Sequence, residues 1–521
     1  MGGNRDASVT AVGCGRVRPS SIDSKINHGG LVGPVSFESI YAGSERQDAV
    51  QLARQLTEHG IRVMSIDPIE GDSNGFRIVV SGGDVARARS IVSRQSEAVA
   101  IQPLNQPPDV EIVLPGSKSQ TNRVLVCAAL ADGRSDLSGV LFANDTNAMI
   151  GALTSLGVDL DIDSDRFAVS VQGCQGELGE APAVVDCAQS GTTSRFMVPM
   201  VALGHGDYVV DGEPQLRSRP MAPLVGALDS LGVNIDGDTL PLTVHANGMK
   251  TGVAEILGSV SSQFLSGLLM AAPYARGGGA SESGVEIQIT DELVSKPYID
   301  LTLATMAHFG VDVINDNYQR FVVGPGRYRG VETQIEPDAS AASYFFAAAA
   351  ITNGRVRIVG LGADSLQGDI EFVSALAQMG AEVEHGPNWT EVRGTGTLHG
   401  IEIDMADISD TAQTLAIVAA FAESPTKVTG IGFIRRKETD RLHAVVTELN
   451  RRGIEARVDD DGFTVWPGTP SPGEVSTYDD HRMAMSFALL GLVHPGITIL
   501  DPQCTSKTFP TYFDVLEQLR R

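Results

Sequence analysis

An internal repeat constrains the possible fold of this chain more than any other feature of its sequence. An amphipathic helix pattern, a glycine and an alternating strand pattern recur in that order five times, at intervals of roughly 70 to 80 residues. Each glycine falls where a helix is expected to end, a position that favours a positive φ angle. One such motif is common in α/β proteins, but five regularly spaced copies are not expected by chance. The five glycines are Gly157, Gly232, Gly310, Gly380 and Gly453.

The repeat predicts α/β domains rather than a solenoid. A second strand pattern follows several copies, for instance at residues 320–323 and 463–466. Each copy therefore reads as a helix with antiparallel strands, and units that pack their apolar helix faces together form one or two α/β domains. The length of 521 residues exceeds what one compact core accommodates, so two or three domains are expected in all.

The residues before about position 105 stand apart from the repeat and end in the linker-like run IQPLNQPPD. Residues 35–98 show the order strand, helix, strand, strand, helix. The strands are expected at 36–41, 62–67 and 76–81, and the helices at 45–59 and 84–94. This βαββα order predicts a small ferredoxin-like module within an N-terminal extension of residues 1–105. A regulatory role, an oligomerisation role and an inert appendage all stay open for it.

The charge of the chain excludes several kinds of partner. The sequence has 64 acidic and 39 basic residues and a formal net charge of −25, which disfavours nucleic acid and anionic membranes. No apolar stretch approaches the roughly 20 residues of a membrane helix, and the first 30 residues contain no apolar signal segment. The five cysteines are scattered without a CxxC pair, so we expect no disulfide framework, no zinc site and a cytoplasmic location.

Several motifs in the first half of the repeat region place polar groups at expected helix starts. LPGSKSQTNR supplies Lys118, Ser119 and Arg123, and a helix N-terminus flanked by such cations favours an anion. In QSGTTSRF, Gly191 allows close approach of a ligand. Simple helix capping is an equally good interpretation of either motif alone. Further candidates in this half are Arg219 in LRSRPM, Ser261, Ser262 and Gln263 in SVSSQF, and Ser295 and Tyr298 in LVSKPYID.

The second half adds carboxylates and more cations. Asp410 in DISDTAQT precedes an apolar helix, where an N-cap is the simpler interpretation. In RRKETDR, we expect Lys437 and Arg441 four residues apart on one face of a helix start, with Glu438 beside Arg441; a solvated charge run is the alternative. Two more cations follow, Arg482 in YDDHRMAM and Lys507 in CTSKTFP.

Taken together, these motifs indicate one anion-binding cleft. If the helix N-termini of two domains face each other, their cations and dipoles converge there and can hold two phosphates and a carboxylate. Asp410 and Glu438 are then carboxylates inside a cationic site, which makes them candidates for proton transfer.

From Pro115 to Leu519 the sequence resembles the 5-enolpyruvylshikimate-3-phosphate synthase family, through LPGSKS, SGTT, SSQF, LVSKPYID, DASAASYF, KETDR, DDHRMAM and CTSKTFP. The resemblance implies an α/β fold of two similar domains, each of three βαβαββ units, in the inside-out barrel of the enolpyruvyl transferases. Domain A would span residues 118–335, and domain B residues 106–117 plus 336–521. The cleft between the domains would close on the substrates.

The resemblance also implies a reaction and a set of roles. Such an enzyme transfers the enolpyruvyl group of phosphoenolpyruvate to the 5-hydroxyl of shikimate 3-phosphate by addition–elimination, in the pathway to chorismate and the aromatic amino acids. Asp410 would take the hydroxyl proton and Glu438 would protonate the methylene carbon. Shikimate 3-phosphate would contact Lys118, Ser119, Arg123, Ser261, Ser262, Gln263, Ser295, Tyr298, Asp410 and Lys437. Phosphoenolpyruvate would contact Lys118, Gly191, Arg219, Gln263, Arg441, Arg482 and Lys507.

No metal or organic cofactor is expected, and a monomer is expected unless the N-terminal module mediates oligomerisation. Three positions depart from the family's usual residues: Gln189 and Phe433 each replace an Asn, and Asn144 replaces the first Asp of a common pair. Because of Phe433, a secondary-metabolite acceptor stays open. The nearest alternative is the enolpyruvyl transferase family that acts on UDP-N-acetylglucosamine, but the loop GEPQLRSRP lacks the Cys usual in that family. A non-catalytic binding protein is the alternative from another class.

Overall fold

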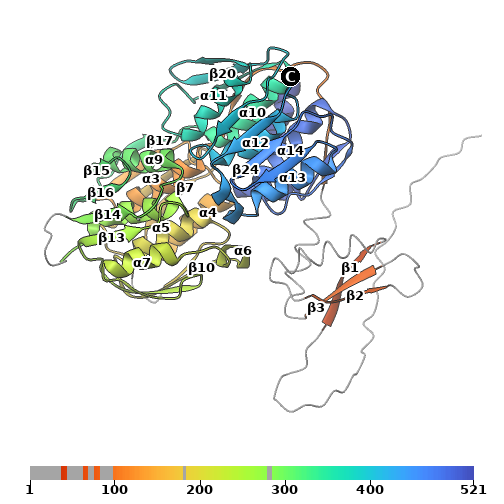
Figure 1. The fold of residues 1–521 in the computed structure, drawn as a ribbon. Helices are drawn as coiled ribbons and strands as arrows, with labels where there is room; N and C mark the ends of the chain where they lie inside the picture. Colours follow the sequence, from red (N-terminus) through yellow and green to blue (C-terminus); the bar gives the residue numbers. More distant parts are fainter. Residues whose placement is uncertain (1–36, 44–62, 69–75, 82–97, 180–182, 278–283) are drawn as a thin grey trace, which may run out of the picture.

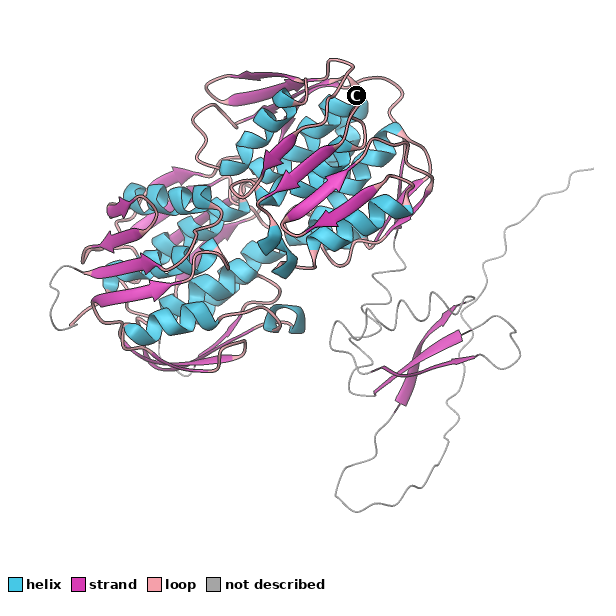
Figure 2. Ribbon diagram, viewed as in Figure 1, coloured by secondary structure: helices cyan, strands magenta, loops and turns pink. Residues whose placement is uncertain are grey.

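The structure is a computed structural model that describes residues 37–43, 63–68, 76–81, 98–179, 183–277 and 284–521. Between residues 98 and 521 it forms two α/β units that lie side by side (Figure 1). Helices fill the interior of each unit and strands cover its outside (Figure 2). No helix in the described part of the chain is long and apolar enough to cross a membrane.

The first unit carries three four-stranded sheets within the described residues. In each sheet one strand pair is parallel and the other two are antiparallel. In spatial order the sheets are β17 (Glu332–Gln334), β6 (Arg134–Ser138), β8 (Ala168–Gln172) and β7 (Asp159–Asp163); β11 (Asn234–Asp236), β12 (Leu242–Asn247), β10 (His205–Asp211) and β9 (Ala183–Asp186); and β13 (Gly252–Ile256), β14 (Val285–Ile289), β16 (Arg320–Val323) and β15 (Val313–Asp316). The helices are α3 (Lys118–Leu130), α4 (Asn144–Ser155), α5 (Gly191–Val201), α6 (Pro214–Arg217), α7 (Ala222–Ser230), α8 (Ser262–Ala271) and α9 (Lys296–His308).

The second unit repeats this plan in the described part of the chain, but its last sheet has three strands. The sheets are β19 (Glu382–His385), β20 (Trp389–Arg393), β18 (Arg355–Val359) and β5 (Asp109–Val113); β21 (Glu402–Asp404), β22 (Thr426–Thr429), β24 (Gly462–Val465) and β23 (Ala456–Asp459); and β25 (Gly473–Val475), β26 (Ile497–Leu500) and β4 (Ala98–Ile101). The helices are α10 (Ala339–Thr352), α11 (Phe372–Gln378), α12 (Ala412–Ala419), α13 (Arg441–Arg451), α14 (His481–Val493) and α15 (Tyr512–Leu516).

Alternate helices form the two cores. Every residue of α5 and α12 is buried, whereas α13 buries one face only. A helix that is apolar all round must be enclosed, so α5 packs against α8 and α12 packs against α14 inside their units. The buried apolar residues accordingly fall into two clusters, one from Val124 to Ile335 and one formed by residues 101–114 and 339–519.

The chain crosses between the units twice. Strand β5 precedes the first unit in sequence but pairs in parallel with β18 of the second, and β17 pairs in parallel with β6 of the first. The two crossings lie together, because Ser117 N donates to Glu336 O at 2.8 Å. We therefore propose a first domain of residues 118–335.

Residues 98–104 contact the second unit. Strand β4 pairs with β26, Leu104 N donates to Leu492 O at 2.8 Å, and Arg520 Nη1 donates to Pro103 O at 2.8 Å. These contacts complete the sheet that otherwise has two strands, so we propose that the second domain begins at Ala98. The linker-like composition of residues 101–109 gave no sign of a strand that pairs about 400 residues away.

Before this point, β1 (Phe37–Gly43), β2 (Val63–Pro68) and β3 (Phe76–Ser81) form an antiparallel sheet in the order β1-β3-β2. The three strands expected in the N-terminal module are therefore present. The helices expected at 45–59 and 84–94 lie outside the described residues.

The repeat glycines have the conformation that their position predicts. Their φ angles are +82°, +78°, +89°, +112° and +78° in sequence order, and each follows a helix. A side chain in this left-handed region is strained, which explains why glycine recurs there.

Two glycines near α4 give opposite expectations for the same substitution. Gly157→Ala should lower the free energy of unfolding by about 1 kcal/mol, because the residue keeps a positive φ. Gly151→Ala should raise it by up to about 1 kcal/mol, because Gly151 is an exposed helical residue whose added Cβ has no atom within 4 Å. Urea denaturation measures both, and equal effects would contradict this explanation of the repeat.

Truncation tests the revised boundary. A chain starting at Ala98 should keep the urea midpoint of the main transition, whereas a chain starting at residue 106 should lose several kcal/mol because it removes β4 and the buried Ile101. Identical midpoints for the two truncations would show that β4 does not belong to the second domain.

Candidate active site

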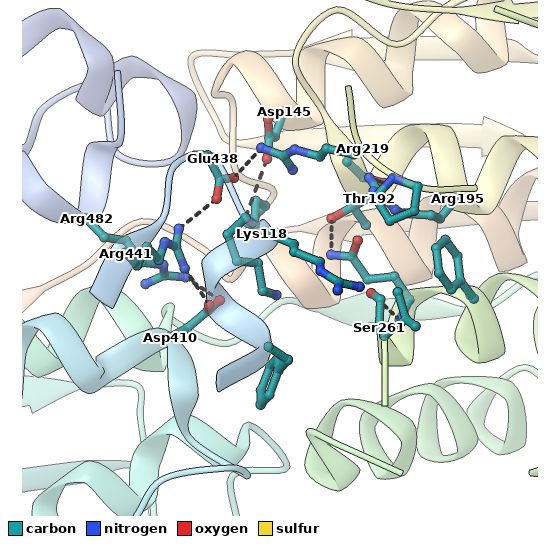
Figure 3. A pocket seen from close by; sticks show the side chains of 18 residues that line it. Lys118, Asp145, Thr192, Arg195, Arg219, Ser261, Asp410, Glu438, Arg441 and Arg482 are labelled. Atoms are coloured by element: carbon teal, nitrogen blue, oxygen red, sulfur yellow. Dashed lines mark hydrogen bonds and ion pairs between the residues drawn. The ribbon is translucent and has the colours of Figure 1, made fainter. Parts of the chain in front are cut away.

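A pocket lies between the two units, at the N-terminal ends of several helices. Including the part open to solvent, it encloses about 640 Å³. Its lining contains seven lysine or arginine side chains but three carboxylates, an excess of positive charge in a chain whose net charge is −25. Such a surplus of buried positive charge favours the binding of an anion. Figure 3 shows these side chains converging from both units.

Capped helix starts bring several of these groups together. Ser117, Ser190 and Ser261 cap α3, α5 and α8, so helix capping is confirmed at Ser117, and the caps at Ser190 and Ser261 are further findings. Their caps leave Lys118, Gly191 and Gln263 in the pocket lining. Helix N-termini carry partial positive charge, so they add to the attraction for an anion.

Asp410 is not a helix cap. The Asp410 side chain instead accepts from Arg441 Nη1 at 3.0 Å and Arg482 Nη2 at 2.6 Å (Figure 3). Burial by itself would raise the pKa of Asp410, but the charges of Arg482, Lys437 and Arg441 outweigh it and hold the pKa well below its usual value. Asp410 is therefore a carboxylate inside the cationic site, as the proton-transfer hypothesis requires.

Glu438 links the two units. It accepts from Arg441 Nη2 at 2.8 Å and lies 3.4 Å from Arg219 Nη2 of the first unit. Burial opposes ionisation, yet the charges of Arg219, Arg441 and Lys507 hold the pKa of Glu438 well below its usual value. One guanidinium, that of Arg441, thus connects both candidate proton-transfer groups.

The remaining expected phosphate ligands are also paired. Lys507 Nζ donates to Asp145 Oδ1 at 2.8 Å and to Gln189 O at 2.8 Å across the units, and Lys118 Nζ lies 3.4 Å from Asp145 Oδ2. Asn144, one of the departures from the family pattern, donates to Ser506 at 2.9 Å beside this contact. Protein carboxylates therefore occupy the cations that an anionic ligand would use.

The structure does not bring every expected residue to this lining. Ser119 and Tyr298 line a smaller pocket of about 260 Å³. Arg123 is buried and donates to Thr302, Ser266 and the carbonyls of Ser119 and Tyr298. Ser262, Ser295 and Lys507 are buried outside the lining. Those within it are Lys118, Gly191, Arg219, Ser261, Gln263, Asp410, Lys437, Glu438, Arg441 and Arg482.

One local expectation was wrong. Lys437 and Arg441 do not share a helix face, because α13 begins at Arg441 with Asp440 as its N-cap. Lys437 lies before the helix, where burial lowers its pKa. A capping residue directly before Arg441 was visible in the motif and indicated this later start.

Four polar lining residues were not among the expected ligands: Asp145, Thr192, Arg195 and Arg436. Arg195 is buried with its Nε unpartnered among the described residues, and burial together with the charge of Arg219 lowers its pKa to about 9. Its place one turn into a glycine-led helix was a usable sequence signal. Phe433 also lines the pocket. The Nζ atom of Lys437 lies over the Phe433 ring, 5.9 Å from its centre.

Comparison with known proteins is decisive for the family. The profile described as EPSP synthase (3-phosphoshikimate 1-carboxyvinyltransferase) matches residues 105–516. This chain belongs to that family. A 3-phosphoshikimate 1-carboxyvinyltransferase of Nostoc punctiforme is 44% identical over 422 residues, which cover 80% of this chain and 98% of the relative. The corresponding protein of Vibrio atlanticus is 44% identical over 431 residues, 81% and 99% of the two chains.

Solved structures agree with the family assignment. EPSP synthase from Acinetobacter baumannii superposes with a TM-score of 0.70 at 26% identity, covering 81% of this chain and 98% of that one. An enolpyruvyl transferase from Streptomyces tendae superposes with a TM-score of 0.66 at 18% identity, covering 81% and 97%, and shows the shared fold alone. The α/β fold and the transferase class expected from the EPSP synthase motifs are thereby confirmed.

The network around Arg441 should contribute strongly to stability. Asp480 is fully buried, accepts from Arg441 Nε at 2.8 Å and caps α14 through Arg482 N at 2.9 Å. Asp480→Asn should lower the free energy of unfolding by about 3 kcal/mol in urea denaturation, because it leaves buried cations less compensated. The control Asp136→Asn, in an exposed pair with Arg134, should leave the urea midpoint unchanged. A small effect at Asp480 would contradict the importance of this pairing.

Proposed function

We propose that this EPSP synthase family member transfers the enolpyruvyl group of phosphoenolpyruvate to the 5-hydroxyl of shikimate 3-phosphate, and so serves aromatic amino acid biosynthesis. The observation that supports this most directly is the cationic pocket between the units. In this pocket Asp410 and Glu438 both accept hydrogen bonds from Arg441. Both substrates are phosphorylated carboxylates, so they supply the negative charge that the lining lacks.

In the proposed reaction the substrates replace protein carboxylates on the cations. Phosphoenolpyruvate takes over Arg441 and Arg482, which now hold Asp410, and Lys507, which now holds Asp145. Release from two guanidinium groups raises the pKa of Asp410, so the base becomes stronger when the donor is bound. Binding of phosphoenolpyruvate therefore prepares the base that the reaction needs.

The chemical steps follow from this exchange. Phosphoenolpyruvate also draws Arg219 and Arg441 away from Glu438, which raises the pKa of Glu438 so that it takes up a proton from water. The acceptor hydroxyl attacks C2 of phosphoenolpyruvate and gives its proton to Asp410, while Glu438 protonates C3. Glu438 then takes a proton back from C3 as the C–O bond to phosphate breaks, and the proton from the hydroxyl leaves with the phosphate. The cations keep charge on phosphate and carboxylate throughout, in a site where water is largely excluded.

Acceptor choice is tested directly by phosphate release. We expect release with phosphoenolpyruvate and shikimate 3-phosphate but none with UDP-N-acetylglucosamine. Phe433, which replaces the family's usual Asn, lines the pocket and could alter the choice of acceptor. A third assay therefore offers other cyclic alcohols as acceptors. Release with one of those alone would favour the secondary-metabolite alternative, and binding without any release would favour the non-catalytic one.

Substitution tests the two carboxylate roles. Asp410→Asn and Glu438→Gln should each lower kcat by about 10²- to 10⁴-fold, because each removes a proton-transfer group. Calorimetric binding of shikimate 3-phosphate should persist in both. The control Asp440→Asn lies in the same motif outside the lining and keeps a capping residue, so its kcat should stay within about threefold of wild type. Unchanged phosphate release in the first two variants would refute the roles.

A further inference from the structure

The hydroxyl of Tyr298 lies between two carboxyl groups. Tyr298 Oη is 3.2 Å from Asp369 Oδ2 and 3.3 Å from Asp410 Oδ2. A phenol carries one proton, so it donates to one of these oxygens at a time and can accept from the other only when that carboxyl is protonated. The three groups therefore form a hydrogen-bonded chain that leads away from the expected base.

Asp369 is the buried end of this chain. It lies in the short 3₁₀ helix of Gly368–Glu371 in the second unit and is 3% exposed. Its Oδ2 accepts from Ser340, while its Oδ1 is buried without a hydrogen-bond partner among the described residues. The neighbouring Arg482 forms its ion pair with Asp410 instead. A buried carboxylate that is only partly satisfied is costly, and a proton relieves that cost.

The two carboxyl groups differ in their affinity for a proton. Asp410 is held by two guanidinium groups, which lower its pKa. Burial and the charges of Asp410 and Asp338 raise the pKa of Asp369 to about 6, against the opposing effects of Arg482 and of the hydrogen bond from Ser340. Burial raises the pKa of Tyr298 well above the ordinary value, so the phenol between the two carboxyl groups keeps its proton. A proton on this chain therefore prefers Asp369.

We propose that Asp369 holds the proton which the acceptor hydroxyl gives up, and that it receives this proton from Asp410 through Tyr298. The inference rests on the proposed function. Asp410 accepts the proton as the new C–O bond forms. Asp410 then donates to Tyr298 Oη while Tyr298 passes its own proton to Asp369 Oδ2, which restores the Asp410 carboxylate. When phosphate leaves, the same proton returns along the chain and departs with it, so one proton moves and no other reactant is needed.

Asp369 acts through Tyr298 and Asp410, so a pH profile distinguishes this role from simple packing. Below its pKa, Asp369 already carries a proton and cannot accept another. The kcat of the wild type should therefore fall at low pH, as Asp369 becomes protonated in the substrate complex. We call this fall of kcat at low pH the acidic limb of the pH profile. In Asp369→Asn the acidic limb should vanish, and kcat should be lower by about 10- to 100-fold. The KM values for both substrates should stay within about threefold of wild type.

Two further variants sharpen the test. Asp364→Asn, an exposed position in the same loop, should keep the wild-type kcat and acidic limb. Ser340→Ala removes a hydrogen bond to the Asp369 carboxylate, so its acidic limb should move to higher pH. Ser340→Ala thus tests the inference even if Asp369→Asn does not fold. Proton transfer from Asp410 through Tyr298 to Asp369 would be overturned by either of two results. One is an acidic limb in Ser340→Ala at the same pH as in the wild type, and the other is a wild-type kcat in Asp369→Asn.

Infrared titration tests the pairing without substrates. The carbonyl band of a protonated buried carboxyl should appear in the wild type as the pH decreases through about 6 and be absent in Asp369→Asn. In Asp410→Asn it should appear only at lower pH, because a repelling charge is gone. An unchanged titration would overturn the pairing. Absence of phosphate release in the wild type would instead overturn the proposed function, and this proton transfer with it, whatever the infrared result.

Discussion

The buried guanidinium of Arg441 is the interaction on which the site depends. It is about 2% exposed and contacts three carboxylates, those of Asp410, Glu438 and Asp480. A buried cation without such partners is strongly destabilising, so these segments of the second unit must meet where they do. Glu438 in turn contacts Arg219, which ties the arrangement to the first unit. The same network thus contains both carboxylates that we propose as proton-transfer groups.

The pairing also explains how a strongly acidic protein keeps a cationic pocket. Carboxylates of the protein compensate part of the positive charge, yet the lining retains four more cations than anions. In the proposed reaction, a ligand that brings phosphate and carboxylate groups completes the compensation and displaces the internal partners. Ligand binding and the strength of the base are then coupled through one set of charges.

Much of the fold followed from local patterns. Helix, glycine and strand patterns repeat because each unit needs a buried helix face and a left-handed residue at the helix end, and the glycines do have positive φ. The pairing of β4 with β26 was not predictable, because register across a long separation leaves no local signal. The position of Lys437 before α13 was mispredicted, since a charge spacing was given more weight than the capping residue Asp440.

For the site, the sequence by itself determined the inventory of chemistry: cations and two carboxylates at helix starts, in motifs specific enough to indicate the family. Only the tertiary structure decided which charges neutralise one another. It pairs Lys507 with Asp145 across the units, turns Arg123 into the protein interior and aligns Asp369, Tyr298 and Asp410. The physical reason is that helix starts follow from short-range capping preferences, whereas ion pairs and pKa values depend on distance and burial between segments far apart in the chain.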